Sequence, residues 1–385
     1  MRPAAGPFAA GASLFGLSLL LLWRGGGDGD TLELQRYGDA LVAGQLPYRD
    51  FRLEYPPGAV PFFTIPSLGA GHAYLTIFRL LTIAGVLLGL LLLALLVERL
   101  GASLTWSYGA LVFGALAPAL LGAFTLRRFD VWPAALCVGV LLLLLTERPL
   151  WAFAVLAAAT LVKTYPAALL PIALIAVDRR VRMRAFAVYC AVGLAVLLPF
   201  LALGHVGLYN SYSGQWNRHL QLETIGSSVL LALHEAGRIA FDSGSWSVFG
   251  STADAVAKVQ TIIQVAAVVA AAILFARSQR TPWDLVGAAA TSVTAAAVAG
   301  KVLSPQFLLW PALLVVLSRS LFAPVLLAAA MLLTNLLFPD RYDGLIARHG
   351  GEIALLAVRN ALLLGLLATL FAAQLRSTAS LRRRG

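Results

Sequence analysis

Long apolar runs recur along the whole sequence, and they decide what this chain can fold into. Of its 385 residues, 60% are hydrophobic and 12% are charged, whereas a soluble globular domain carries about 25% charged residues. So few charged side chains cannot cover a water-facing surface, and most of the surface must therefore meet lipid. The sequence predicts an all-α polytopic membrane protein rather than a soluble domain with an anchor.

The basic net charge agrees with a membrane protein. A charge of +11 would suggest a nucleic-acid partner in a soluble protein, but Lys and Arg accumulate in the cytoplasmic loops of membrane proteins. We therefore expect membrane lipids, and no nucleic acid, among the partners. The two cysteines, Cys137 and Cys190, lie in apolar runs without the spacing of a metal or redox pair, which indicates packing residues.

A membrane-spanning helix needs about 20 apolar residues, and fewer inside a bundle, so we predict about 10 to 12 transmembrane segments. The candidate runs are residues 8–23, 74–97, 104–124, 131–145, 150–177, 185–203, 259–275, 283–299, 302–317, 321–338 and 353–371. We expect the first run to be a retained span rather than a signal peptide. The run 150–177 should turn back near Lys163 as two half-helices, because Pro166 breaks a helix there. Residues 59–68 are too short to span and are predicted to be re-entrant or interfacial.

Basic loops predict the orientation. With both termini in the cytoplasm, the basic run 178–184 and the basic tail 376–385 lie inside, as the positive-inside rule expects. The first loop, residues 24–73, and the large loop, residues 204–258, then lie outside. No internal repeat or linker marks a second unit, so residues 1–385 are predicted to form one integral membrane domain.

Residues 24–58 form the most charged part of the outer surface, with four Asp, two Glu and four Arg. Glycines let the chain turn sharply after the first span, which would put Asp30 or its neighbour Asp28 at the membrane surface as a general base; the alternative is a solvated acidic turn. Residues 31–41 have the apolar spacing of an amphipathic helix lying on the membrane. The PYRDF and EYPPG segments that follow are predicted to be extended.

The basic residues predicted on the outer surface run against the positive-inside bias, among them Arg128, Lys163, Arg218 and Lys301. Arg and Lys in such positions suit an anionic headgroup or phosphate. The alternatives are a surface turn for Arg128 and a snorkelling side chain for Lys163. Residues 215–224 form a polar and aromatic patch of the kind that contacts sugars.

Several catalytic motifs are absent from the sequence. It contains no GxSxG, P-loop, HExxH or Rossmann glycine pattern, and its five histidines lack ligand spacing. Direct use of ATP or of a nucleotide-sugar is therefore not expected.

The segment DTxxxxxYGDAxxxGxxPYRDFxxEYPPG (residues 30–58) resembles the first outer loop of GT-C-fold membrane glycosyltransferases of family 87, the polyprenyl-phosphate-mannose-dependent mannosyltransferases. Weaker matches are RRFDVWP (127–133), LVKTYP (161–166), RHLQLET (218–224) and KVLSPQFLLW (301–310). The sequence departs from the family where a Tyr often follows the Asp, since Leu34 stands in that region. The resemblance covers roughly residues 8–320.

The resemblance implies a GT-C-like bundle that transfers a hexose, with mannose favoured, from a polyprenyl-phosphate sugar to a lipid or glycan acceptor with inversion. It implies Asp30 (alternatively Asp28) as the base, and fixed cations that stabilise the leaving phosphate, namely Lys163, Arg128, Lys301 and Arg218. The substrate-binding candidates are Asp130, Tyr55, Glu54, Gln306, Glu223 and His219. No cofactor and no obligatory metal are expected.

A non-enzymatic flippase of lipid-linked sugars is the main alternative to an enzyme. Such a transporter should line its interior with charge through the full membrane depth and often contains internal repeats. Here the charge gathers toward one predicted face, which favours the transferase. The sugar, the acceptor and the choice between Asp30 and Asp28 stay open at this point.

Overall fold

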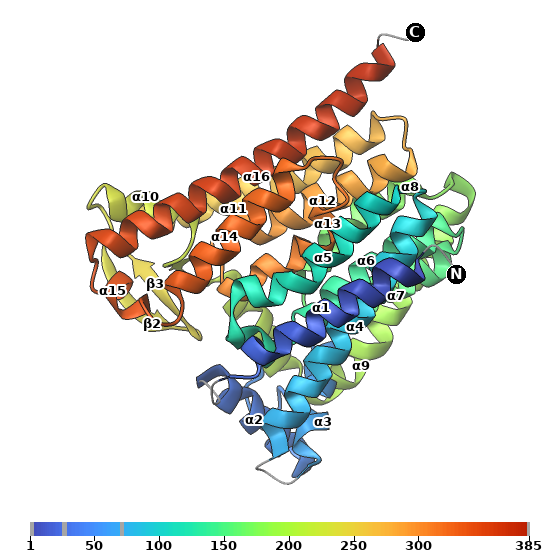
Figure 1. Ribbon diagram of the computed structural model, residues 1–385. Helices are drawn as coiled ribbons and strands as arrows, with labels where there is room; N and C mark the ends of the chain where they lie inside the picture. The colour runs from blue at the N-terminus through green and yellow to red at the C-terminus, as the bar shows by residue number, and fades with distance from the viewer. Residues whose placement is uncertain (1–3, 25–28, 70–72, 383–385) are drawn as a thin grey trace.

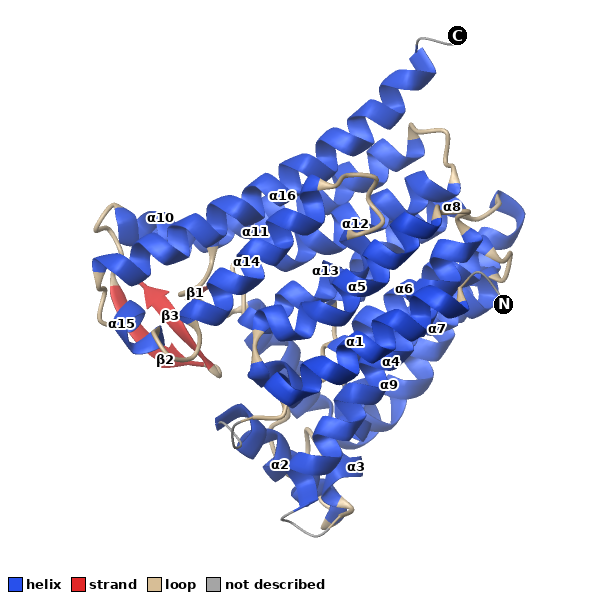
Figure 2. Ribbon diagram, viewed as in Figure 1, coloured by secondary structure: helices blue, strands red, loops and turns tan. Residues whose placement is uncertain are grey.

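The computed structural model describes residues 4–24, 29–69 and 73–382 and shows a bundle of helices (Figure 1). A small sheet with strands β2 and β3 lies at one end of the bundle (Figure 2), and helix α1 begins and α16 ends away from it. Among the described residues, six helices are long and apolar enough to cross a membrane. They are α1 (Ala5–Leu22), α4 (Tyr74–Arg99), α5 (Leu104–Leu121), α9 (Arg179–Trp216), α11 (Ser251–Ala276) and α16 (Gly350–Arg382).

Shorter helices complete the bundle and its ends. They are α2 (Gly29–Val42), α3 (Val60–Ser67), α6 (Val131–Leu145), α7 (Pro149–Val162), α8 (Leu170–Ala176), α10 (Ile225–Ala232), α12 (Pro282–Val298), α13 (Leu309–Val315), α14 (Phe322–Leu337) and α15 (Tyr342–Ile346), with 3-10 turns η1 (Pro57–Ala59), η3 (Ala123–Arg127), η4 (Tyr165–Leu169) and η5 (Pro305–Leu308). This architecture confirms the predicted all-α polytopic membrane fold.

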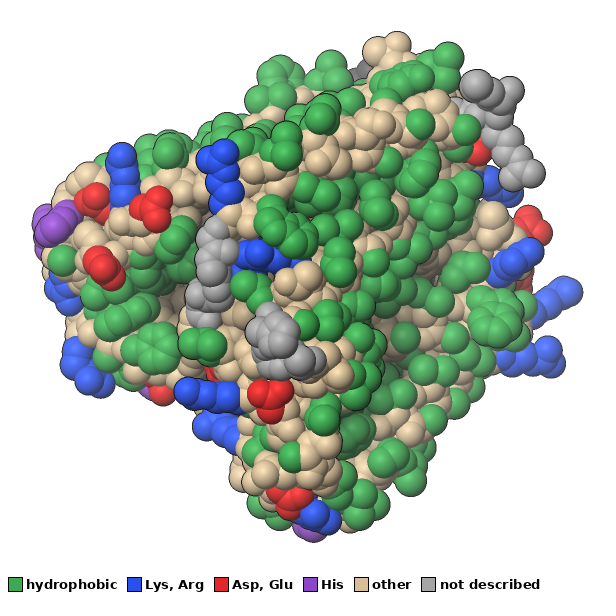
Figure 3. All heavy atoms as spheres, turned by 60° about the horizontal axis from the view of Figure 1, so that its bottom comes forward, with side chains coloured by type: hydrophobic (Ala, Val, Ile, Leu, Met, Phe, Trp, Pro, Cys, Tyr) green, Lys and Arg blue, Asp and Glu red, His purple; other side chains and the backbone are tan. Residues whose placement is uncertain are grey.

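Apolar side chains dominate the surface of the bundle, and charged side chains gather toward its ends (Figure 3). One large core cluster joins the helices, with Phe15, Leu90, Leu111, Phe153 and Leu314 each almost fully buried. Because lipid offers no water to drive helices together, this close packing itself holds the bundle.

The predicted break near Lys163 is confirmed. Helix α7 ends at Val162, and Lys163 has extended backbone angles, with φ −148° and ψ 145°. Pro166 then stands in the first turn of η4, which continues into α8. The missing N–H and fixed φ of proline suit the start of a helix but not its interior, so the chain presents Lys163 at the break.

The predicted amphipathic helix is present as α2. Leu34 and Tyr37 are buried, and α2 packs against the short helix α3. The predicted extended form of the PYRDF segment is wrong. Tyr48 has a positive φ of 67°, and its N–H donates to the Phe51 carbonyl at 2.9 Å, so the segment is a tight turn whose geometry overrides the preference set by Pro47.

The expected large loop, residues 204–258, is mostly ordered secondary structure. Helix α9 continues through it to Trp216, with a non-helical Gly204 at a kink. Strands β1 (Leu220–Gln221), β2 (Arg238–Asp242) and β3 (Ser245–Phe249) then form an antiparallel sheet in the order β1-β3-β2. The strands have only two to five residues each, so their pattern does not stand out beside the long apolar helices, and no strand is expected from the sequence.

Candidate active site

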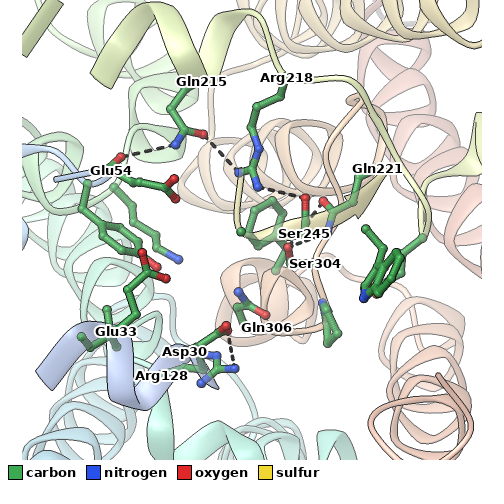
Figure 4. A pocket seen from close by; sticks show the side chains of 18 of the residues that line it. Asp30, Glu33, Glu54, Arg128, Gln215, Arg218, Gln221, Ser245, Ser304 and Gln306 are labelled. Atoms are coloured by element: carbon green, nitrogen blue, oxygen red, sulfur yellow. Dashed lines mark hydrogen bonds and ion pairs between the residues drawn. The ribbon is translucent and has the colours of Figure 1, made fainter. Parts of the chain in front are cut away.

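A cavity of about 360 Å³ lies at the sheet end of the bundle. The first turn of α2, the loop before η1, the break at Lys163, the end of α9, strands β1 and β3, and η5 all contribute to it (Figure 4). Its polar and charged lining side chains include Asp30, Glu33, Glu54, Arg128, Lys163, Gln215, Arg218, Gln221, Glu223, Ser245, Ser304 and Gln306. Segments from most of the chain therefore converge on one chemically mixed cavity.

Asp30 and Arg128 form an ion pair at one side of this cavity. The distance from Arg128 Nη2 to Asp30 Oδ2 is 2.6 Å. The Asp30 side chain is 53% exposed and that of Arg128 is 7% exposed, so the carboxylate reaches the open space while the guanidinium is held by the protein. Asp30 stands in the first turn of α2, where the helix dipole favours a negative charge.

Lys163 lies deeper, between a carboxylate and a group of aromatic rings. Its Nζ is 2.6 Å from Asp130 Oδ1, and the same oxygen accepts a hydrogen bond from Trp310 Nε1 at 2.7 Å. The ammonium also lies 5.0 Å from the Phe129 ring centroid and 5.6 Å from that of Phe307. Rings at these distances stabilise a cation, so the ammonium is fixed in position at the edge of the cavity.

The opposite wall joins the first loop to the end of α9. Gln215 Nε2 donates to the Glu54 carbonyl at 3.4 Å, and Arg218 Nη1 donates to Gln215 Oε1 at 3.2 Å. Arg218 Nη2 donates to Ser245 Oγ at 3.0 Å, which ties the wall to β3. Burial raises the pKa of the Glu54 carboxyl, although Arg218 opposes that rise.

Glu223 lies in the segment between β1 and α10, where side chains of α15 and α16 hold it in place. Arg359 Nη2 of α16 donates to the Glu223 carbonyl at 2.9 Å and lies 3.8 Å from its carboxylate. Tyr342 donates its hydroxyl to Glu223 Oε1 at 3.1 Å. Burial raises the pKa of Glu223 to about 7, against the opposing effects of Arg359 and Tyr342. The Glu223 carboxylate therefore interacts with two side chains of the protein itself, Tyr342 and Arg359.

The structure brings most of the predicted site residues together, but not all. Tyr55 and Gln306 line the cavity with the residues above. Lys301 and His219 do not: Lys301 donates to the Trp216 carbonyl at 2.6 Å, and His219 pairs with Asp254 at 3.2 Å. The Asp130 side chain is 1% exposed and forms its ion pair with Lys163 on the buried side of the lysine. Asp28 lies outside the described residues.

Some lining residues are not among the site residues predicted individually. Glu33 follows Asp30 by three positions on α2, and such spacing puts two side chains on one helix face, so this residue was findable. Gln221 falls in the predicted sugar-contacting patch 215–224 and Ser304 in the motif 301–310, but only the tertiary structure brings the two together, with Gln221 Nε2 donating to Ser304 Oγ at 3.0 Å. Their sequence positions are far apart and carry no shared pattern.

The described part of the chain contains no group of three or more His, Cys, Asp or Glu side chains placed to hold a metal ion. Metal independence stays a prediction.

A family model described as glycosyltransferase family 87 matches residues 53–305, about two thirds of the chain. The chain belongs to glycosyltransferase family 87. Comparison with curated proteins finds no match. As a member of family 87 the protein is a glycosyltransferase.

The range matched by the family 87 model includes many, but not all, of the residues that line the cavity. It contains the cations Arg128, Lys163 and Arg218, along with Glu54 and Tyr55. Asp30 lies before the matched range and joins the site through its ion pair with Arg128. Most residues that line the cavity therefore fall within the family match.

Proposed function

We propose that this protein transfers a hexose, with mannose favoured, from a polyprenyl-phosphate sugar to a lipid or glycan acceptor on the extracytoplasmic face of the cell membrane. The observation that carries the proposal is the joint occupation of one cavity by an accessible carboxylate, Asp30, and by the cations Arg128, Lys163 and Arg218. Such a set matches a reaction that needs a base on one reactant and positive charge around the other.

The proposed chemistry is a single inverting displacement. The acceptor hydroxyl oxygen attacks the anomeric carbon while the bond from that carbon to the phosphate oxygen breaks. Asp30 takes the hydroxyl proton as a general base. The electron pair leaves with polyprenyl phosphate, and preorganised cations stabilise the charge that develops on it. Arg128 would serve both reactants, since it holds Asp30 and faces the cavity.

One feature of this end of the bundle supports a lipid-borne donor, and a second supports its extracytoplasmic orientation. Much of the cavity wall is aromatic, including Tyr55, Phe307 and Trp310, and the surrounding helices are apolar. The basic run 178–184 begins α9 at the other end of that helix from Gln215. Lys and Arg mark the cytoplasmic side, so the cavity would face away from the cytoplasm.

The test uses purified protein with synthetic polyprenyl-phosphate sugars, mannose included, and a panel of lipid acceptors. We expect transfer from at least one donor, and a loss of kcat of about 100-fold or more in Asp30→Asn, the size expected for removal of a general base. Asp39→Asn is the matched control, because Asp39 is exposed on the same helix and does not line the cavity.

Two results would overturn the proposal. One is the absence of transfer from every donor, combined with movement of the lipid-linked sugar across vesicle membranes, which would favour a flippase. The other is equal turnover by Asp30→Asn and wild type, which would remove Asp30 as the base. Orientation is tested separately by labelling a cysteine at Gln45, which should react from the extracytoplasmic side.

A further inference from the structure

A second cavity, of about 340 Å³, lies at the end of the bundle opposite the candidate active site. The end of α11, the start of α12, the segment after α13 and the last turns of α16 form it. Helix α12 has 17 residues, a length of roughly 25 Å, and the chain just beyond its far end bonds to Gln221 in the first cavity. The two cavities are thus separated by about the thickness of a bilayer core.

Two buried polar side chains line this second cavity without hydrogen-bond partners in the part of the chain that the structure describes. Gln374 is 8% exposed and Ser318 is 5% exposed. Neither the amide atoms of Gln374 nor the Ser318 hydroxyl has a hydrogen-bond partner among the described residues. Buried polar groups in native proteins are nearly always hydrogen-bonded. These groups therefore indicate a bound molecule that offers both hydrogen-bond acceptors and donors.

The charge at the mouth of this cavity is positive. Arg319 and Arg376 line it and are exposed, and the Arg319 guanidinium lies 5.1 Å from the centroid of the Trp283 ring, which orients it. Asp284 is the one acidic residue among the described lining residues, and its carboxylate is already engaged. One oxygen accepts from the Thr281 N–H at 3.0 Å and the other from the Ser377 hydroxyl at 2.5 Å.

We propose that this cavity binds the phosphate-bearing headgroup of an anionic membrane lipid. Guanidinium groups suit phosphate oxygens, and the Gln374 N–H and Ser318 hydroxyl can donate to further oxygens of a phosphate ester. Gln374 Oε1 can accept from a hydroxyl of the headgroup. Basic pockets between membrane helices on the cytoplasmic side bind acidic headgroups, and a tryptophan at the mouth suits the membrane interface. A free phosphate shares this chemistry. The lipid is favoured because Ile273 and Leu375, on the same helix ends, are 44% and 52% exposed and can contact acyl chains.

Native mass spectrometry of the full-length protein in detergent tests the site without any need for turnover. The probes are phosphatidylglycerol and phosphatidylcholine with identical acyl chains. We expect phosphatidylglycerol to bind at least tenfold more tightly, and the double variant Arg319→Gln/Arg376→Gln to lose that preference. Gln374→Leu replaces the amide with an apolar side chain of similar size. It should weaken the binding of phosphatidylglycerol several-fold and leave the melting temperature unchanged.

The matched control is Arg277→Gln/Arg280→Gln, because both arginines are exposed at the same end and neither lines the cavity. The proposal would be overturned if the control and the Arg319/Arg376 variant weakened phosphatidylglycerol binding equally, because binding would then depend only on the overall positive charge of this end of the protein. Equal binding of the two lipids would also overturn it. Displacement of phosphatidylglycerol by inorganic phosphate at the same concentration would make the site a free-anion site instead.

Discussion

Lys163 and Trp310 share one acceptor, Asp130 Oδ1, which lies 2.6 Å from the lysine Nζ and 2.7 Å from the indole Nε1. The lysine comes from the break between α7 and η4, the carboxylate precedes α6, and the indole belongs to α13. One buried oxygen thus joins three elements at the edge of the cavity.

Asp130→Asn should destabilise the protein. The substitution leaves the Lys163 charge, which is 12% exposed, without its counterion, and breaking a buried pair costs about 3–5 kcal/mol. Thermal unfolding in detergent measures the effect, with exposed Asp340→Asn as the control. The double variant Asp130→Asn/Lys163→Met should recover much of the lost stability, because no buried charge remains. A double variant less stable than the single one would contradict this explanation.

Lys163→Ala should lower kcat/KM by about 100-fold, the size typical of losing one fixed electrostatic contact in a transition state. The comparison is with Lys258→Ala on α11, where the side chain is exposed and away from the cavity. Transfer from a polyprenyl-phosphate sugar is the assay, with the melting temperature measured for both variants. Equal rates for the two variants would remove Lys163 from phosphate binding.

The Glu223 carboxyl should make the folded protein less stable as pH rises. Its folded pKa of about 7 lies above the ordinary value of 4.5, so folding favours the protonated form. The contribution is fully present below pH 4.5 and is lost as pH rises through 7. Melting temperatures from pH 4.5 to 8 should fall less steeply for Glu223→Gln than for wild type. The exposed Glu235→Gln should follow wild type, and identical slopes for all three proteins would refute the prediction.

Gly207→Ala should separate α9 from the first loop. An added Cβ would lie 1.7 Å from the Tyr48 carbonyl oxygen, so the turn at residues 47–51 or the helix must move. Overpacking of this kind costs about 1–3 kcal/mol, and the neighbouring Gln215 and Glu54 wall should lose alignment, with a lower kcat. Gly193→Ala on the same helix has open space around it and should leave both the melting temperature and the rate unchanged. Normal activity in Gly207→Ala would show that this contact does not position the wall.

Much of the bundle was predictable from local patterns. The apolar runs fixed the main helices, and Pro166 placed the break at Lys163, because proline acts on its own turn of the chain. The spacing of Leu34 and Tyr37 gave α2. The turn at Tyr48 and the sheet after Trp216 were not predictable, since short polar segments take their conformation from the surfaces they contact.

The sequence by itself determined that this is a helical membrane protein, and its motifs pointed to family 87 and to Asp30, Arg128 and Lys163. The tertiary structure decided which charges face the cavity. It pairs Arg128 with Asp30, buries Asp130 behind Lys163, and turns Lys301 and His219 to other partners. Hydropathy is a property of each segment, whereas the partner of a charge depends on which helices pack together, and no segment of the sequence contains that information alone.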